Sequence, residues 1–415
     1  MTQRLEWEAQ VDEKGRLVLP PEIAFRYGLN PGVQVCMAEG ENGLRLRRPI
    51  SHLAKVYVEP TNGCNLECRT CIRNGWDEPL GQMSDTIFDR VIDGLRAFSP
   101  PPTVFFGGFG EPLAHPHIVE MVSRAKALGG PVEMITNGTL LTQDISRRLI
   151  GAGLDMLWVS IDGATPKSYA DVRLGAALPE VLANLASLRE ARRGADLSKP
   201  EVGIVFVAMK RNIADLPAVV RLGRQLGVKR FLVTHVLPYT AEMRQEVLYE
   251  RALNDFGYLP SLSGLDLPKM DVNAMTGRAL YTIMRSRENL IFAGVPLAQD
   301  KDRCPFIENG ATAVHWEGGL SPCLPLLHNH ISFLNGYTRF SRRHVIGNLG
   351  ESTLADLWND PEYTAFRRRV QTFEFSFCTS CGVCDLGQGN EEDCFGSPFP
   401  TCGGCLWAQG IIRCP

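Results

Sequence analysis

The sequence predicts an α/β protein built on a parallel sheet of about six strands, with a small β-rich module before the sheet and a cysteine-rich domain after it. Three observations support this prediction. Apolar, strand-like runs alternate with amphipathic stretches between residues 53 and 240. The first fifty residues contain turn and hairpin signals. Nine of the 13 cysteines lie from Cys304 onward, so the last part of the chain differs in composition from the rest.

Composition argues against several classes of protein. A chain of 415 residues with 44% hydrophobic residues can bury a large core and should hold two or three domains. Its formal net charge of -3 provides no general attraction to nucleic acid or to anionic membranes. No segment approaches the roughly 20 apolar residues that span a bilayer, and the polar start MTQRLEWEAQ does not resemble a signal peptide.

Cysteine usage predicts metal binding in a reducing, anaerobic cytoplasm. Thirteen cysteines in a long chain without an export signal indicate metal sites and not disulfides. Cys36 stands alone in the sequence, and we expect it to be a core thiol and not a ligand.

The first fifty residues are predicted to form strands, a short helix near PEIAFRYGL and a hairpin. Pro21 at the helix start and Gly32 in a turn support that order. The segment resembles the AbrB/MazE-type swapped-hairpin module, on the pattern GRLVLPxEIxxxxGLxPG. That resemblance implies a homodimer through this module and DNA contact through basic residues, here Lys14, Arg16 and Arg26. A solvated basic face is the simpler alternative, because a few charges on an acidic chain bind phosphate weakly, and nucleic acid is not expected as a partner.

The middle of the chain is predicted to form repeated βα units. Five amphipathic helical stretches separate the strand candidates AKVYVEP, PTVFFGG, PVEMITN, DMLWVSID, EVGIVFVAM and KRFLVTHV. Such repeats imply a parallel sheet with right-handed crossovers. The loops at the carboxyl ends of the strands then build the active site.

A cysteine triplet follows the first of these strands. Cys64, Cys68 and Cys71 in TNGCNLECRTC have the spacing C-x3-C-x2-C. Three thiolates can bind three irons of a cubane cluster and leave the fourth iron open to a small molecule. Zinc is the alternative, but structural zinc sites close all four positions. No further cysteine occurs between Ile72 and Arg303, so an open iron–sulfur site is favoured.

The other strand ends bring glycine-rich and polar segments to the same rim. GGFGEPL follows the second strand, and its glycines allow backbone to approach a ligand closely. ITNG and SIDG follow the third and fourth strands, and Arg173 can pair with a carboxylate. Turn or helix-cap chemistry is the alternative for Asn137, Asp162 and Asp171 taken singly. Their joint placement at one rim favours a ligand site, with the candidate cofactor-binding residues Gly107, Gly108, Gly110, Glu111, Asn137, Ser160, Asp162 and Arg173.

These motifs resemble those of the radical S-adenosylmethionine (SAM) superfamily over residues 53–240. The resemblance implies a partial (β/α)6 TIM-like barrel in which the triplet holds a 4Fe–4S cluster that binds S-adenosylmethionine. The GGxGEP turn would receive the methionine amine, and Asn137, Ser160, Asp162 and Arg173 would contact the ribose or the methionine. One departure is Thr70, where many members have an aromatic residue. The implied chemistry is reductive cleavage of S-adenosylmethionine to a 5′-deoxyadenosyl radical, with a low-potential donor such as ferredoxin or flavodoxin.

The cysteine-rich end is predicted to hold auxiliary clusters. Cys304 and Cys323 flank a predicted hairpin, ATAVHWEGGLSPC, and IGNLGESTLADLWND runs into a helix. Nine thiolates can hold two four-cysteine clusters with one thiolate left over. Two zinc ribbons are the alternative, because CTSC and CGGC look like zinc knuckles. The candidate ligands are Cys304, Cys323, Cys378, Cys381, Cys384, Cys394, Cys402, Cys405 and Cys414.

This end resembles the SPASM-type extension of radical SAM enzymes, which implies one or two auxiliary 4Fe–4S clusters for electron relay or substrate docking. Cys304 and Cys323 match the early pair of that pattern, and its late group is matched by Cys378, Cys381 and Cys414. The assignment of each thiolate stays open, because CDLGQGNEEDC looks like an insertion and CGGC is shorter than usual. The predicted domains are 1–50, a barrel at 51–240, a helical connector at 241–303, and 304–415.

The combination of the first module with CRTCIRNGWDEP and CGGCLWAQGIIRCP resembles radical SAM maturases associated with tungsten-pterin oxidoreductases of the aldehyde:ferredoxin type. It implies a role in maturing the tungsten enzyme or its pterin cofactor. Two alternatives stay open. One is a peptide-modifying SPASM enzyme of the thioether or formylglycine type. The other is a DNA-binding iron–sulfur regulator, which has no use for the GGFGEP and SIDG rim.

No catalytic acid or base follows from the sequence. His235 and Tyr239 lie at or beyond the end of the sixth strand, where a cavity mouth and a packed core are both consistent with their positions. Trp76, Asp77 and Glu78 follow the triplet closely and either shape the cofactor pocket or form a simple loop.

Overall fold

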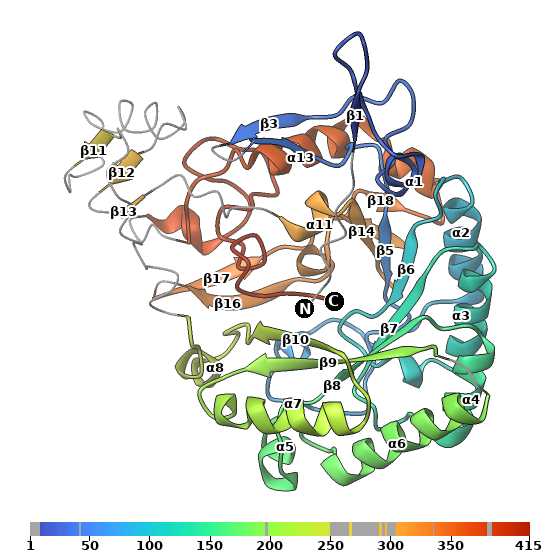
Figure 1. Ribbon diagram of the computed structural model, residues 1–415. Coiled ribbons are helices and arrows are strands. Elements are labelled where there is room, and N and C mark those ends of the chain that lie inside the picture. The colour runs from blue at the N-terminus through green and yellow to red at the C-terminus, as the bar shows by residue number, and fades with distance from the viewer. Residues whose placement is uncertain are drawn as a thin grey trace.

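A nine-stranded sheet organises the structure, which is a computed structural model (Figure 1). The structure describes residues 9–40, 43–195, 198–249, 265–267, 290–292, 295–296, 304–334, 336–379 and 384–415. Among these residues, no helix is long and apolar enough to cross a membrane.

Six consecutive parallel strands confirm the predicted partial (β/α)6 barrel. They pair side by side in chain order, so each βα unit returns next to the strand before it. Their residues are largely buried, as expected for strands covered on both faces. The strands are β5 (Lys55–Val58), β6 (Thr103–Phe106), β7 (Val132–Thr136), β8 (Met156–Ser160), β9 (Glu201–Ala208) and β10 (Arg230–His235).

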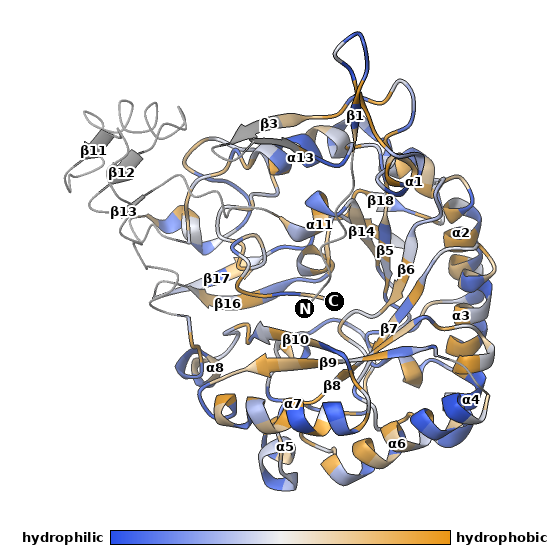
Figure 2. Ribbon diagram, in the orientation of Figure 1, coloured by the Kyte–Doolittle hydropathy of each residue, from blue (hydrophilic) through white to orange (hydrophobic). Residues whose placement is uncertain are grey.

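Helices cover the outer, convex side of this half of the sheet (Figure 1). Each buries an apolar stripe against the strands, and Figure 2 shows hydrophobic and hydrophilic residues on different sides of these helices. Ser84 and Thr142 cap two of them through their side chains. The helices are α2 (Asp85–Leu95), α3 (Ile118–Lys126), α4 (Gln143–Gly151), α5 (Pro166–Val172), α6 (Leu178–Gly194) and α7 (Leu216–Gln225).

The C-terminal domain continues the same sheet beyond β5. Strand β14 (Ala311–Val314) pairs in parallel with β5, and β15 (Gly319–Ser321) returns as the predicted hairpin, followed by β18 (Gly347–Asn348). The sequence did not predict this junction. The domain also contains a second hairpin and three helices: β16 (His330–Leu334), β17 (Tyr337–Ser341), α11 (Pro305–Glu308), α12 (Leu354–Trp358) and α13 (Pro361–Thr372).

The first fifty residues contain the predicted strands, short helix and hairpin. The elements are β1 (Gln10–Val11), β2 (Leu17–Val18), α1 (Pro21–Arg26), β3 (Met37–Gly40) and β4 (Gly43–Leu46). The expectation for Cys36 was wrong, because this thiol is exposed. Few of the described residues of this module are buried, so it offers Cys36 little interior.

The predicted helical connector at 241–303 lies largely outside the described residues. The described pieces of this stretch are one short helix and three short strands. These are α8 (Ala241–Gln245), β11 (Leu265–Leu267), β12 (Leu290–Phe292) and β13 (Val295–Pro296). The connector therefore stays a prediction.

Candidate functional site

The cysteine triplet lies in the loop that leaves the carboxyl end of β5. Cys64, Cys68 and Cys71 are free thiols, and the Cys71 amide donates to the Cys68 carbonyl at 3.0 Å. Burial raises the pKa of the Cys68 and Cys71 thiols, and the negative charge of the neighbouring thiolates raises it further. All three thiols belong to the same eight-residue stretch of this loop. Their chemistry and placement therefore fit one polynuclear metal centre.

The glycine-rich loop after β6 packs directly on the triplet loop. A Cβ atom on Gly110 would overlap the carbonyl oxygen of Thr61, and one on Gly108 would lie 2.6 Å from Glu59 Oε1. The Glu111 amide donates to the Gly63 carbonyl at 2.9 Å. The sequence analysis assigned these glycines to close ligand approach. The structure shows that they also let two loops meet backbone to backbone.

Glu111 joins the glycine-rich loop to the end of β7. Its Oε1 accepts from Thr136 Oγ1 at 2.7 Å and from the Leu113 amide at 3.0 Å, and its Oε2 accepts from the Asn137 amide at 2.7 Å. Burial raises the pKa of this carboxyl, and these hydrogen bonds oppose the rise. The Asn137 Nδ2 atom then lies 3.8 Å from Cys64 Sγ. Glu111 therefore supports Asn137 at the rim.

A buried ion pair brings positive charge to the triplet. Asp162 Oδ2 accepts from Arg173 Nε at 2.6 Å, while Asp162 Oδ1 accepts from the Val207 amide at 2.6 Å. Arg173 also places a guanidinium nitrogen 3.8 Å from Cys68 Sγ. Burial disfavours the charged guanidinium, yet Asp162 and the Cys68 thiolate raise the pKa of Arg173 above its ordinary value. Arg173 therefore stays charged beside the triplet.

The remaining rim candidates have different surroundings. Ser160 is the last residue of β8 and is buried. Asp171 is exposed and forms ion pairs with Arg69 at 3.7 Å and Arg211 at 3.2 Å, away from the buried pair. Tyr239 donates to the Arg69 carbonyl and accepts from the Asn74 side chain, so it supports the triplet loop.

A second polar cluster lies beside the rim, and the sequence analysis missed most of it. Trp76 stacks on the His328 ring with centroids 4.2 Å apart, and Glu78 Oε2 lies 2.5 Å from His328 Nδ1. The other face of the cluster is Glu59 and His315. Single histidines and glutamates far apart in the sequence carry no spacing signal, so motif reasoning could not find them.

Four C-terminal thiols line one cavity. Cys304, Cys323, Cys402 and Cys405 face the same interior space and are free thiols. Burial raises the pKa of the Cys323 and Cys402 thiols well above the usual range, and the thiolates of the group raise it further. This donor set fits a four-cysteine centre. The CGGC pair therefore lies with the early pair of the SPASM pattern.

Other C-terminal cysteines form a second group. Burial raises the pKa of Cys394 to about 12, and the Cys378 and Cys384 thiolates nearby contribute to the rise. Cys381 lies outside the described residues. The three described thiols, Cys378, Cys384 and Cys394, have the donor chemistry of a second cluster.

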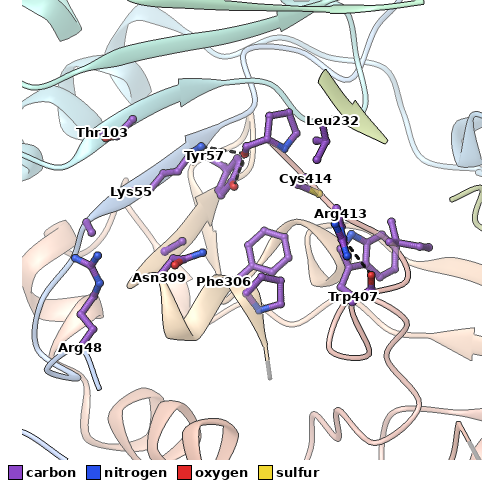
Figure 3. A pocket seen from close by; sticks show the side chains of 16 residues that line it. Arg48, Lys55, Tyr57, Thr103, Leu232, Phe306, Asn309, Trp407, Arg413 and Cys414 are labelled. Atoms are coloured by element: carbon purple, nitrogen blue, oxygen red, sulfur yellow. Dashed lines mark hydrogen bonds between the residues drawn. The ribbon is translucent and has the colours of Figure 1, made fainter. Parts of the chain in front are cut away.

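Cys414 lies beside the first group, in a pocket at the amino ends of β5 and β6 (Figure 3) that shares Phe306 and Trp407 with the cavity of that group. Lys55 Nζ and Tyr57 Oη donate to the Pro415 carbonyl at 2.9 and 2.8 Å and hold the chain terminus there. The triplet lies at the carboxyl ends of the strands. This pocket is therefore at the opposite end of the sheet.

The buried ion pair predicts a contrast between two neighbouring aspartates. Asp162→Asn should lower the free energy of unfolding by about 3–5 kcal/mol, because it leaves the Arg173 guanidinium buried without its carboxylate. Asp171→Asn, which breaks an exposed pair, should cost no more than about 1 kcal/mol. Anaerobic urea unfolding followed by circular dichroism measures both values. Equal losses of unfolding free energy in the two variants would contradict the importance of the buried ion pair.

Comparisons with known proteins agree with this geometry. The Radical SAM superfamily model matches residues 58–223, and the SPASM iron–sulfur cluster-binding domain model matches residues 304–385. A tungsten-containing aldehyde ferredoxin oxidoreductase cofactor-modifying protein of Pyrococcus furiosus is 30% identical over 87% of this chain and 96% of its own length. An AdoMet-dependent heme synthase of Methanosarcina barkeri is 26% identical over 80% of this chain and 88% of its own.

The fold has relatives among solved structures as well. Streptococcus suis SuiB bound to S-adenosylmethionine superposes with a TM-score of 0.52 at 16% identity, over 81% of this chain and 72% of that one. This likeness concerns the fold alone. Together with the cysteine triplet at the rim of the partial barrel, the matches show that this chain is an enzyme of the radical SAM superfamily with a C-terminal SPASM domain.

Proposed function

We propose that this enzyme cleaves S-adenosylmethionine reductively and acts in the maturation of a tungsten-pterin oxidoreductase of the aldehyde:ferredoxin type, or of its cofactor. One observation carries this proposal. The relative from Pyrococcus furiosus matches over 96% of its own length and 87% of this chain, so the match extends beyond the barrel. If the two proteins shared only the partial barrel, the match would cover only the middle of the chain.

The rim residues have distinct roles in this proposal. Cys64, Cys68 and Cys71 hold the cluster, which together with bound S-adenosylmethionine supplies a hydrogen-abstracting radical. The loop with Gly107, Gly108 and Gly110 offers peptide groups to the methionine amine. The remaining candidates Asn137, Ser160, Asp162 and Arg173 would contact the methionine or the ribose. Glu111 and Asp162 also hold their neighbours in place, through the Asn137 amide and Arg173 Nε.

The auxiliary centres follow from the two thiol groups. Cys304, Cys323, Cys402 and Cys405 would hold one 4Fe–4S cluster, since they line one cavity. Cys378, Cys381, Cys384 and Cys394 would hold a second, which would leave Cys414 as the ninth thiolate. We propose that the domains are 1–50, 51–240, 241–303 and 304–415. A low-potential ferredoxin or flavodoxin in the cytoplasm is the proposed electron donor.

Cys68→Ala tests the first step. The variant should form no 5′-deoxyadenosine, because the cluster then lacks one of its three thiolate ligands. Chromatography of anaerobic reactions with dithionite and S-adenosylmethionine measures this product. Cys36→Ala is the matched control and should retain activity, since Cys36 is exposed and outside every thiol group. Unchanged product formation by Cys68→Ala would refute the assignment.

The substrate is tested by mass spectrometry of a tungsten oxidoreductase expressed with this protein or with Cys68→Ala. A mass change in the extracted cofactor or in the oxidoreductase, seen with the unaltered protein alone, supports the proposal. If neither changes while a short peptide is modified, the peptide-modifying alternative holds. SuiB also has a structure bound to the precursor peptide SuiA, at a TM-score of 0.51, but that likeness shows the fold alone.

We further propose that the first module joins two copies of the chain. Large apolar side chains are exposed on its short strands and helix, namely Val11, Leu17, Val18, Phe25 and Met37. Exposed groups of this size favour an interface, and the swapped-hairpin resemblance points to a second copy. Val18→Glu should convert a dimer to a monomer in light scattering. If the unaltered protein is already a monomer in light scattering, this proposal is wrong.

A further inference from the structure

Two strands that pair in parallel place an acid and a histidine side by side. Glu59 follows β5 and His315 follows β14, and Val58 pairs with Val314 in the register of these strands. The Glu59 amide donates to the Val314 carbonyl at 3.0 Å. His328 completes the group from the segment after β15. All three side chains are buried, and their candidate ligand atoms lie within 4.8 Å of one another.

Among the atoms of this group that face one another, one histidine nitrogen has no hydrogen-bond partner among the described residues. His328 Nε2 lies 2.9 Å from Glu59 Oε2, whereas His315 Nε2 lies 3.9 Å from the same oxygen. In the part of the chain that the structure describes, His315 Nε2 has no hydrogen-bond partner, although the side chain is only 8% exposed. Burying an unsatisfied polar atom is costly. An atom bound between the three side chains would satisfy it.

The outer nitrogen of His328 is held as it is in many metal sites. His328 Nδ1 lies 2.5 Å from a carboxylate oxygen of Glu78, and Trp76 stacks on the ring and fixes its plane. A carboxylate on the far nitrogen is the common second partner of a metal-bound histidine. His315 Nδ1 accepts from the Glu317 amide at 3.2 Å, and the Glu317 carboxylate lies 3.6 Å from the same nitrogen. Metal binding at Nε2 would require the ring proton to move to Nδ1, with the Glu317 carboxylate closing in to accept it in place of the amide contact.

Charge also favours a cation here. Glu59 and Glu78 flank one imidazole, so the cluster holds two carboxylates against at most one imidazolium. A divalent ion that replaces the proton on His328 Nε2 would balance both carboxylates. Two imidazoles with one carboxylate suit zinc or ferrous iron, and do not suit calcium or magnesium.

We propose that Glu59, His315 and His328 bind one divalent transition-metal ion, separate from the iron–sulfur clusters. Three protein ligands leave at least one position open for an oxygen, nitrogen or sulfur atom of a substrate. Glu59 Oε1 accepts from the Phe109 amide at 3.1 Å, which sets the metal beside the glycine-rich loop. The ion would anchor a substrate next to the rim where S-adenosylmethionine is proposed to bind.

Isotope dialysis tests this site in the full-length, cluster-loaded protein under anaerobic conditions. After dialysis against enriched zinc, mass spectrometry should find one more zinc per chain in the unaltered protein than in His315→Gln or His328→Gln. His117→Gln is the matched control, because His117 is exposed on the outer surface, and it should bind zinc normally. Iron content and the visible spectrum report whether each variant still folds and holds its clusters.

Two further measurements keep the test decisive if a histidine variant loses iron. Glu78→Gln, which alters an outer partner alone, should weaken zinc binding by about 10–100-fold. The second measurement is manganese binding followed by electron paramagnetic resonance, because manganese disfavours thiolate ligands and should not bind the cysteines. Binding should be saturable in the unaltered protein and lost in His315→Gln. Equal zinc and manganese binding by all proteins, or none by any, would overturn the proposal. Because neither measurement uses S-adenosylmethionine or an oxidoreductase, the metal site and the proposed function can fail independently.

Discussion

The site depends on the parallel pairing of β5 with two strands that lie far from each other in the sequence. Val58 at the end of β5 pairs with Phe106 of β6 and with Val314 of β14. The first pairing places the triplet loop against the glycine-rich loop, and the second places the C-terminal domain at the same rim. Parallel strands end at one edge of a sheet. Backbone hydrogen bonds therefore decide which loops meet.

Close contact between those loops limits what the glycine positions can accept. Gly108 and Gly110 face Glu59 and the Thr61 carbonyl, so any side chain there would push the glycine-rich loop off the triplet loop. Glu111 then connects the same loop to β7 through buried hydrogen bonds. The rim is thus a set of interlocked loops, and displacing one loop would move the polar groups on the others.

Buried thiols link cluster binding to folding. Burial raises the pKa of Cys68, Cys323 and Cys402, so each thiolate is costly without a positive partner. Cluster binding replaces the thiol protons with metal, which should stabilise the fold and make cluster assembly depend on pH. Arg173 beside Cys68 lowers this cost at the triplet by keeping a positive charge near the sulfur.

The sequence by itself determined the six strands, most of the helices between them and the cysteine triplet, because hydrophobic periodicity and short spacings are local. The hairpin at Cys323 followed for the same reason. The tertiary structure decided that β14 joins β5, that Cys402 and Cys405 lie with Cys304 and Cys323, and that Glu59 meets a histidine 269 residues away. No local pattern records a contact over such a separation. Such a contact forms only when particular strands pair in the sheet and their side chains are buried together.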